Sequence, residues 1–176
     1  AEQLAPMIAE AAKRIGETLL SDRKILACGN GGSAGDALHF VGELVNRFEI
    51  ERPPLPAIAL GNNLITATAT ANDYSFEEIY AKEIQALGRQ GDILLAISTS
   101  GQSPNIIKAA ETALERGLRL VILTGGEGGE LSDVARAEED LVLKVDSHTT
   151  ARIQEVHILI LHALCMLVDQ ELFGSA

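Results

Sequence analysis

Two side chains that can carry protons or bind a metal, His39 and Glu43, lie four residues apart in the segment GNGGSAGDALHFVGEL. On a helix this spacing lets both side chains face one target. The apolar stripe that would pack on the protein core consists of Ala37, Val41, Leu44 and Phe48. A His-x-x-x-Glu pair on a helix is commonly only a solvated ion pair. Its place in the turns after a Gly/Ser loop, where a ligand of a parallel sheet would lie, favours a site instead.

The glycine-rich loop that precedes this helix allows two further interpretations. Gly29-x-Gly31-x-x-Ala34 fits the loose dinucleotide fingerprint, but the second predicted strand ends in Leu60-Gly61-Asn62-Asn63, without the acidic residue that would hold the ribose. Dinucleotide binding is therefore not favoured. Alternatively, Ser33 followed by Asp36 reads as a capping box at a helix start.

A second loop, Thr99-Ser100-Gly101-Gln102-Ser103-Pro104-Asn105, follows another apolar run. Pro104 suits the first position of a helix and Ser103 the cap before it. Capping leaves Ser98, Thr99 and Ser100 unexplained. Three hydroxyls and free backbone N–H groups at a helix start form a neutral cradle for phosphate, which an acidic protein can use.

The C-terminal segment ARIQEVHILILHALCMLVDQELF (151–173) is apolar nearly all round, so we expect one face to pack on the sheet and another on a second subunit. We expect His157 to be a hydrogen-bonded core residue. His162, if it reaches a site, would be held neutral by burial, as metal binding or base catalysis requires. Gln154 and His162 are separated by ~12 Å along a straight helix and by about 80° around it. For both to serve one site, the helix must begin irregularly near Gln154 or two subunits must contribute.

Short, continuously apolar runs separated by helical patterns predict the scaffold that positions these residues. Continuous rather than alternating hydrophobicity indicates strands covered on both faces, as in a parallel sheet. We therefore predict a three-layer α/β/α sandwich with right-handed crossovers. The predicted strands are 24–29, 55–60, 92–98, 118–125 and 140–145, and the predicted helices are 33–48, 75–88, 103–116 and 149–172.

Length and composition limit the function further. The 176 residues suit a single domain (1–176), and a formal net charge of −11 argues against a nucleic-acid backbone as partner. Cys28 and Cys165 lie in apolar runs and read as buried, reduced thiols, which suits the cytoplasm. The longest apolar stretch, around 156–168, is shorter than the roughly 20 residues of a membrane span, so we expect no membrane association.

Several collinear motifs resemble the phosphoheptose isomerases (GmhA type) of the sugar isomerase (SIS) superfamily, and the similarity extends over essentially the whole chain. They are CGNGGSAGDALHF with Glu43 following, RPPLPAIAL, the Ala71-Asn72-Asp73 turn, EIQALGRQGDILLAISTSGQS, LTGGEGGEL and ARIQEVHILILH. The resemblance implies a five-stranded parallel sheet of flavodoxin-like order, an N-terminal helix and a homotetramer with sites between subunits. It also implies conversion of sedoheptulose 7-phosphate to D-glycero-D-manno-heptose 7-phosphate, the first step of ADP-heptose synthesis for lipopolysaccharide.

The resemblance assigns roles to individual residues. Glu43 and His162 match the proposed acid/base pair, and one Zn²⁺ per subunit is implied at four positions. These zinc positions are His39, Glu43, Gln154 and His162. The implied sugar-phosphate contacts are Asn30, Gly31, Ser33, Glu43, Asn72, Asp73, Ser98, Thr99, Ser100, Ser103 and Gln154. Ala151 departs from the pattern of the family, in which some members have Asp at this position.

The expected chemistry agrees with these parts. Ketose–aldose isomerisation needs a base for the proton beside the carbonyl, polarisation of the carbonyl oxygen, and return of the proton through an enediol. Glu43 and His162 can move protons, and Zn²⁺ can act as a Lewis acid.

Two alternatives belong to other functional classes. VNRFEIERPPLPAIAL and ARIQEV also resemble the DiaA-type proteins, tetramers that bind the replication initiator DnaA. A pure protein-binding module has no chemical need for His39, Glu43, Gln154 and His162 together, which favours the enzyme. A sugar-phosphate-sensing domain is usually joined to a DNA-binding domain, for which this chain has no room.

Overall fold

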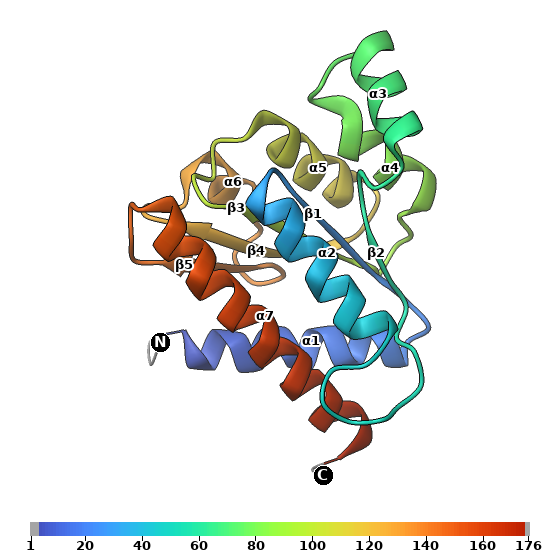
Figure 1. The fold of residues 1–176 in the computed structure, drawn as a ribbon, viewed down its shortest axis with the longest axis vertical. Helices are drawn as coiled ribbons and strands as arrows, with labels where there is room; N and C mark the ends of the chain where they lie inside the picture. Colours follow the sequence, from blue (N-terminus) through green and yellow to red (C-terminus); the bar gives the residue numbers. More distant parts are fainter. Residues whose placement is uncertain (1–3, 175–176) are drawn as a thin grey trace.

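A computed structural model describes residues 4–174, which form a five-stranded parallel sheet between helices (Figure 1). The strand order is β2-β1-β3-β4-β5, the flavodoxin-like order expected. The strands are β1 (Ile25–Gly29), β2 (Ala57–Ala59), β3 (Ile93–Ser98), β4 (Arg119–Gly125) and β5 (Leu141–Val145). The helices are α1 (Ala5–Leu20), α2 (Gly32–Val45), α3 (Leu64–Asp73), α4 (Glu78–Leu87), α5 (Pro104–Glu115), α6 (Gly129–Val134) and α7 (Thr150–Phe173).

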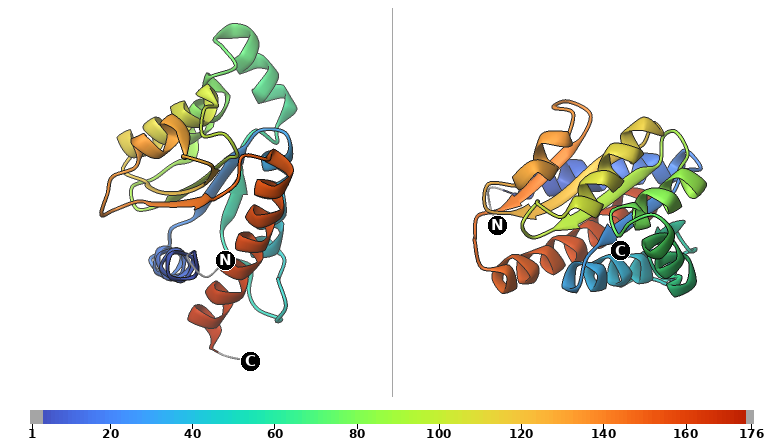
Figure 2. Two further views of the ribbon diagram at one scale, coloured as in Figure 1. Left: turned by 90° about the vertical axis from the view of Figure 1, so that its left-hand side faces the viewer. Right: turned by 90° about the horizontal axis from the view of Figure 1, so that it is seen from above.

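Helices cover both faces of the sheet, as the continuously apolar strands predict (Figure 2). Side chains alternate along each strand, so neighbouring residues of β3 enter different cores. Leu95 and Ile97 pack with α1, α2 and α7, whereas Leu94 and Ala96 pack with α4, α5 and α6. The three-layer α/β/α prediction is confirmed.

The five predicted strands and the main helices all form, with ends shifted by a few residues. The strand that shortens most is β2, which is paired only over Ala57–Ala59 because the preceding ERPPLP segment contains three prolines that cannot donate to a ladder. Two helices, α3 and α6, lie where no helix is predicted. The prediction of a loop turn at Ala71-Asn72-Asp73 is wrong, because these residues form the C-terminal end of helix α3.

The helix α3 projects from the body of the molecule (Figures 1 and 2). It begins at Asn63, whose Oδ1 accepts hydrogen bonds from the backbone of Ile65 and Thr66. Apolar side chains in and beside it are exposed, Ile65 by 80% and Tyr74 by 65%. Its sequence, LITATATAND, has no apolar stripe of helical period, and its side chains find little to pack against within the chain.

The long helix α7 is apolar enough to span a membrane by length and composition alone. In the structure it packs against α1, α2 and the sheet, and it buries the polar residues His157 and Asp169. The core helix of a soluble protein passes the same test of length and composition, and the packing of α7 accords with that description.

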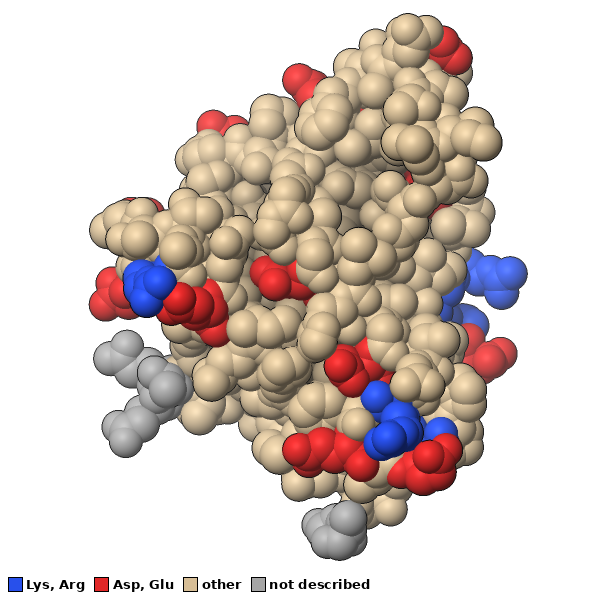
Figure 3. All heavy atoms as spheres, in the orientation of Figure 1, with Lys and Arg blue, Asp and Glu red and all other residues tan. Residues whose placement is uncertain are grey.

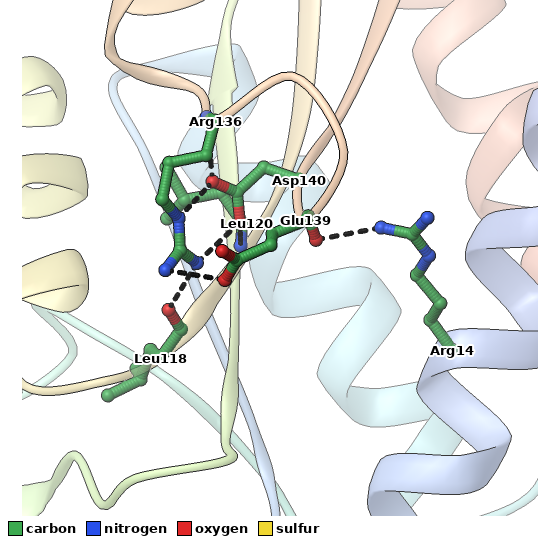
Figure 4. A network of polar contacts seen from close by, with 6 residues as sticks. All are labelled: Arg14, Leu118, Leu120, Arg136, Glu139 and Asp140. Carbon is green, nitrogen blue, oxygen red and sulfur yellow. Dashed lines mark hydrogen bonds and ion pairs between the residues drawn. The ribbon is translucent and has the colours of Figure 1, made fainter.

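A polar network fixes the start of β5 (Figure 4). The Asp140 carboxylate accepts hydrogen bonds from the Leu120 backbone at 2.8 Å and from the Arg136 guanidinium at 2.9 and 3.0 Å. Arg14 of α1 donates to the Glu139 carbonyl at 2.7 Å. The edge strand is thereby joined to β4 and to α1.

Candidate active site at the carboxyl edge of the sheet

The loop after β1 turns sharply into α2. Gly31, with φ of +55°, occupies the N-cap position, which favours glycine because side chains are strained there. The predicted capping box is therefore wrong: Ser33 lies inside the helix, buried to 4% exposure, and no side chain caps the helix start. A Cβ at Gly29 would lie 2.5 Å from the Ser33 carbonyl oxygen, so the loop also needs glycine for close approach.

His39, which shares one face of α2 with Glu43, contacts both Glu43 and His162 of α7. The Nε2 atoms of His39 and His162 are 2.8 Å apart, and Glu43 Oε1 is 3.4 Å from His39 Nε2. The side chains of His39 and Glu43 are 43% and 24% exposed, so a ligand can reach them. Among residues 4–174, no preformed group of three or more His, Cys, Asp or Glu side chains meets the geometry of a metal site. The structure thus brings together three of the four predicted zinc positions without a completed site.

Gln154 lies at another level of the same helix pair. A Cβ on Gly32 would be 2.3 Å from Gln154 Nε2, so this amide packs against the first turn of α2, whereas His162 contacts His39. From Gly32 to His39 the helix rises by about 10 Å. Within one chain, therefore, Gln154 and the His39–His162 pair are separated, as the spacing on α7 predicts.

The loop after β3 is organised by hydroxyl groups. Ser98 Oγ donates to Ser103 Oγ at 3.3 Å and accepts from the Gly101 N–H at 3.2 Å, and Ser100 Oγ accepts from the Gln102 N–H at 3.2 Å. Ser103 occupies the N-cap position before Pro104, as predicted, but its side chain makes no capping hydrogen bond. Pro104 has no N–H, and the N–H groups of Ile106 and Ile107 donate to the Ser103 carbonyl, both at 3.0 Å. The Asn105 N–H is therefore the backbone donor that this helix start leaves for an anion.

A cavity of about 350 Å³ opens beside this loop. Its walls include Thr99, Ser100 and Gln102, the glycine-rich loop 125–129 after β4, and His148. It lies at the carboxyl ends of β3 and β4, the edge where ligands of open α/β sheets bind.

Asn30, in the first loop, pairs with a residue that the sequence alone did not single out. Asn30 Nδ2 donates to Asn105 Oδ1 and Asn105 Nδ2 donates to Asn30 Oδ1, both at 2.8 Å. Asn105 is 1% exposed at the start of α5. The buried Tyr80 of α4 donates its hydroxyl hydrogen to the Gly29 carbonyl, and this hydroxyl is 3.4 Å from Asn30 Oδ1. The sequence does contain one indication of Asn105: it is a polar residue directly after Ser103-Pro104, at the start of the helix that follows the predicted phosphate loop.

Asn72 and Asp73 stand apart from these groups. Both lie at the exposed end of α3, where Asn72 Nδ2 donates to Asp73 Oδ1 at 2.9 Å. No hydrogen bond within the described part of the chain joins them to the other predicted sugar-phosphate contacts.

The expectation for His157 is confirmed. It is completely buried, and its Nε2 is 3.2 Å from the Thr124 carbonyl at the end of β4. Burial lowers the pKa of His157 despite that hydrogen bond, so the ring is neutral at pH 7. It fixes α7 on the sheet and is not part of the His39–His162 cluster.

Comparison with known proteins agrees with this architecture. Residues 1–125 match the family model described as the SIS domain. The chain is 58% identical over 173 residues to the phosphoheptose isomerase of Shewanella denitrificans, covering 98% of this chain and 88% of that protein. A phosphoheptose isomerase structure from Francisella tularensis superposes with a TM-score of 0.91 at 48% identity, covering 94% of this chain and 86% of that one. For GmhA from Neisseria gonorrhoeae the TM-score is 0.90 at 43% identity, with coverage of 95% and 87%.

Proposed function

Because the chain belongs to the phosphoheptose isomerases of the SIS-domain family, we propose that its cluster of His39, Glu43 and His162 carries out the isomerisation of sedoheptulose 7-phosphate. The product is D-glycero-D-manno-heptose 7-phosphate, the precursor of ADP-heptose. The relatives found favour this isomerase over the DnaA-associating alternative.

The contact between His39, Glu43 and His162 carries the proposal. These residues lie about two helical turns along α2 from the glycine-rich loop, a distance of about 10 Å. That separation is comparable with the length of an extended seven-carbon sugar phosphate. A substrate bound beside the glycine-rich loop, which the Asn30–Asn105 pair joins to the Ser98–Ser103 loop, can therefore extend toward the cluster.

The Ser98–Ser103 loop would bind the phosphate. Its hydroxyls and the Asn105 N–H at the start of α5 supply donors without a positive side chain. Thr99 and Ser100 also line the adjoining cavity. Binding energy from this end, which does not react, orients the carbons that do.

Glu43 and His162 would move the protons. One of them takes the proton from the carbon beside the carbonyl, and the pair returns a proton to the neighbouring carbon of the enediol. Glu43 is a partly exposed carboxylate on a rigid helix, and His162 is held by contact with His39 and with the ring of Phe48. Rigid placement of this kind favours proton transfer because it limits motion away from the reacting atoms.

Zinc is part of the proposal because the donor set suits it. Two imidazole Nε2 atoms and one carboxylate are typical zinc ligands, and the two nitrogens already face one another. His39, Glu43 and His162 would hold the ion, with the Gln154 amide of a neighbouring subunit as fourth donor. A zinc ion bound there would polarise the carbonyl oxygen of the substrate.

A homotetramer completes the proposal, with Gln154 or the exposed Asn72 and Asp73 reaching the site of a neighbouring subunit. The outer face of α2 and α7 exposes large apolar side chains, and most of the molecular face in Figure 3 carries no charge. Large apolar side chains exposed together on one face are typical of an interface. The exposed residues on these helices are Leu38, Val45, Leu159 and Met166. The two free, buried cysteines suit the reducing cytoplasm.

The test is to supply zinc and sedoheptulose 7-phosphate to the purified protein and to follow aldoheptose 7-phosphate by NMR. We expect turnover that His162→Ala abolishes and that Glu115→Gln, at the far end of α5, leaves unchanged. A folded, zinc-loaded protein without turnover would overturn the isomerase proposal and make binding to DnaA the next hypothesis to test.

A further inference from the structure

We propose that Asn105 is a positioning residue that fixes the Asn30 amide for hydrogen bonding to the sugar phosphate and couples the first loop to the phosphate loop. The proposal rests on the proposed function, since it assigns a role in binding the same substrate. Asn30 and Asn105 have no proposed role in metal binding or in proton transfer.

The pairing of the two amides is reciprocal. Each donates one N–H and accepts at its oxygen, with both donor–acceptor distances at 2.8 Å. Asn105 is 1% exposed and belongs to the first turn of α5, so its position follows that of the helix. Asn30 is partly exposed and belongs to the loop between β1 and α2. The buried amide therefore holds the more exposed one.

Counting donors shows what Asn30 retains for a ligand. A primary amide has two N–H donors and one oxygen acceptor with two lone pairs. In Asn30 one N–H and one lone pair are used by Asn105. The remaining N–H is free to donate to an oxygen of a bound sugar phosphate, in a direction set by the pair.

Tyr80 supports this orientation from a third element. Its hydroxyl has a single hydrogen, which it donates mainly to the Gly29 carbonyl, and it lies 3.4 Å from Asn30 Oδ1, so Asn30 Oδ1 receives at most a weak, shared hydrogen bond from it. Burial raises the pKa of Tyr80 to about 12, with smaller contributions from Cys28 and Glu83, so the hydroxyl stays protonated at neutral pH. A Cβ at Gly61 would lie 2.8 Å from the Tyr80 ring, so the ring is closely packed.

The arrangement has a consequence for the site as a whole. Asn105 comes two residues after Ser103, a predicted phosphate contact, and Asn30 comes directly before Gly31, the N-cap of α2. The amide pair is thus a direct link between the loop that would bind phosphate and the helix that carries His39 and Glu43. A shift of α5 relative to α2 would break it.

A double-mutant cycle tests the proposal. The four proteins are the wild type, Asn30→Ala, Asn105→Leu and the double variant, assayed for kcat and KM with sedoheptulose 7-phosphate. Leucine has the same branched arrangement of four side-chain heavy atoms as asparagine, with bulkier methyl groups in place of the amide, and it removes both hydrogen bonds. We expect each single variant to lower kcat/KM by about 10-fold to 100-fold, as for one or two lost hydrogen bonds. Because Asn105 acts through Asn30, we expect the double variant to match Asn30→Ala rather than to show the product of both effects.

Two further variants separate positioning from stability. Tyr80→Phe removes one hydroxyl from another helix, and we expect it to lower kcat/KM by less than 10-fold. Thr112→Val is the matched control, since it changes a buried polar residue of α5 two turns away from the pair, and we expect unchanged kinetics. Thermal melts confirm that each variant is folded. If Asn105→Leu does not fold, Asn105→Ala, which also removes both hydrogen bonds, replaces it in the cycle with the same criterion.

The outcomes distinguish this proposal from the proposed function. An active wild type in which the two effects multiply, or in which Asn105→Leu has no effect, overturns the positioning role and leaves the isomerase intact. If the wild type does not turn over, calorimetric binding of sedoheptulose 7-phosphate to the same four proteins gives the cycle instead. A wild type with neither turnover nor binding overturns both proposals.

Discussion

The Nε2 atoms of His39 and His162 are 2.8 Å apart, although the two residues are separated by 123 positions in the sequence. Two neutral imidazoles can share this distance only if one nitrogen donates its hydrogen and the other accepts it. The same two nitrogens, both without hydrogen, would bind one metal ion. The contact can therefore hold either a hydrogen or a zinc ion between the two nitrogens, one at a time.

His39→Ala and His162→Ala should each weaken zinc binding by at least about 10-fold, because each removes a proposed ligand. Zinc bound per chain, measured by atomic absorption after dialysis against a weak chelator, gives the result. His148→Ala is a suitable control, since His148 lines the neighbouring cavity and does not contact the cluster. Full zinc occupancy in both cluster variants would place the metal elsewhere.

Glu43→Gln should abolish turnover while the fold and the subunit assembly stay intact. The amide keeps the size of the side chain but cannot accept a proton from carbon, and loss of a general base typically costs about 10²-fold to 10⁴-fold in rate. Turnover, circular dichroism and size-exclusion chromatography should be measured on the same preparation. Unfolding of this variant would mean that Glu43 has a structural role.

Gly101→Ala should destabilise the protein and weaken substrate binding. Gly101 has φ of +64°, and a Cβ there would lie 1.8 Å from the Gly128 carbonyl oxygen, so the phosphate loop and the loop after β4 must separate. We expect a loss of at least about 1 kcal/mol in the free energy of unfolding and a raised KM.

Gly35→Ala is the matched control for that experiment. Gly35 lies within α2 and a Cβ there meets nothing within 4 Å, so alanine should stabilise the protein by about 0.5–1 kcal/mol. Urea unfolding of both variants gives the comparison. Equal effects of the two substitutions would show that the close approach of the loops does not govern stability.

The sequence predicts the parts of this molecule that depend on local pattern. The apolar runs reveal the strands because both faces of the sheet are covered, and Pro104 places the start of α5. Local pattern misled at Ser33, because the tight turn at Gly31 starts α2 earlier and takes Ser33 into its first turn. Local pattern gave no indication of α3, which lacks an apolar stripe of helical period.

Contacts between distant segments could not be predicted in this way. The spacing of His39 and Glu43 on one helix is visible in the sequence, but their meeting with His162 depends on how α7 lies on α2. The Asn30–Asn105 pair likewise depends on the sheet order, which places β1 beside β3 and so brings their following loops together. Such contacts follow from topology, since the residue types alone do not specify a partner.

Stability should decrease in acid partly through Asp140. Burial alone would raise the pKa of Asp140, but hydrogen bonds from Arg136 and from the Leu120 backbone outweigh it and lower the folded-state pKa below 3.8. A carboxyl with a lowered pKa stabilises the fold fully above its unfolded pKa, and this stabilisation is lost as the pH falls through the folded pKa. Asp140→Asn should be less stable than the wild type at pH 7, and the difference should shrink below about pH 4. Urea unfolding from pH 7 to pH 2.5 measures it, and a difference that does not change with pH would contradict the argument.

The ion pair between Arg52 and Asp169 should be among the most costly to break. Arg52 Nε is 2.9 Å from Asp169 Oδ1, and its other nitrogens donate to the carbonyls of Leu44 and Glu43, at 2.6 and 2.8 Å. The Arg52 and Asp169 side chains are only 1% and 6% exposed, so removing one partner leaves a buried charge without compensation. Asp169→Asn should therefore lower the free energy of unfolding by about 3–5 kcal/mol.

Two comparisons make that result specific to burial. Glu17→Gln breaks an ion pair with Lys13 in which both side chains are more than half exposed. It should lower the free energy of unfolding by less than about 1 kcal/mol. The double variant Arg52→Met/Asp169→Leu removes both charges and should recover most of the loss, because no unpaired charge remains. Urea midpoints of the four proteins decide the matter. A double variant as unstable as Asp169→Asn would show instead that the Arg52 hydrogen bonds to the end of α2, beside Glu43, are what the fold requires.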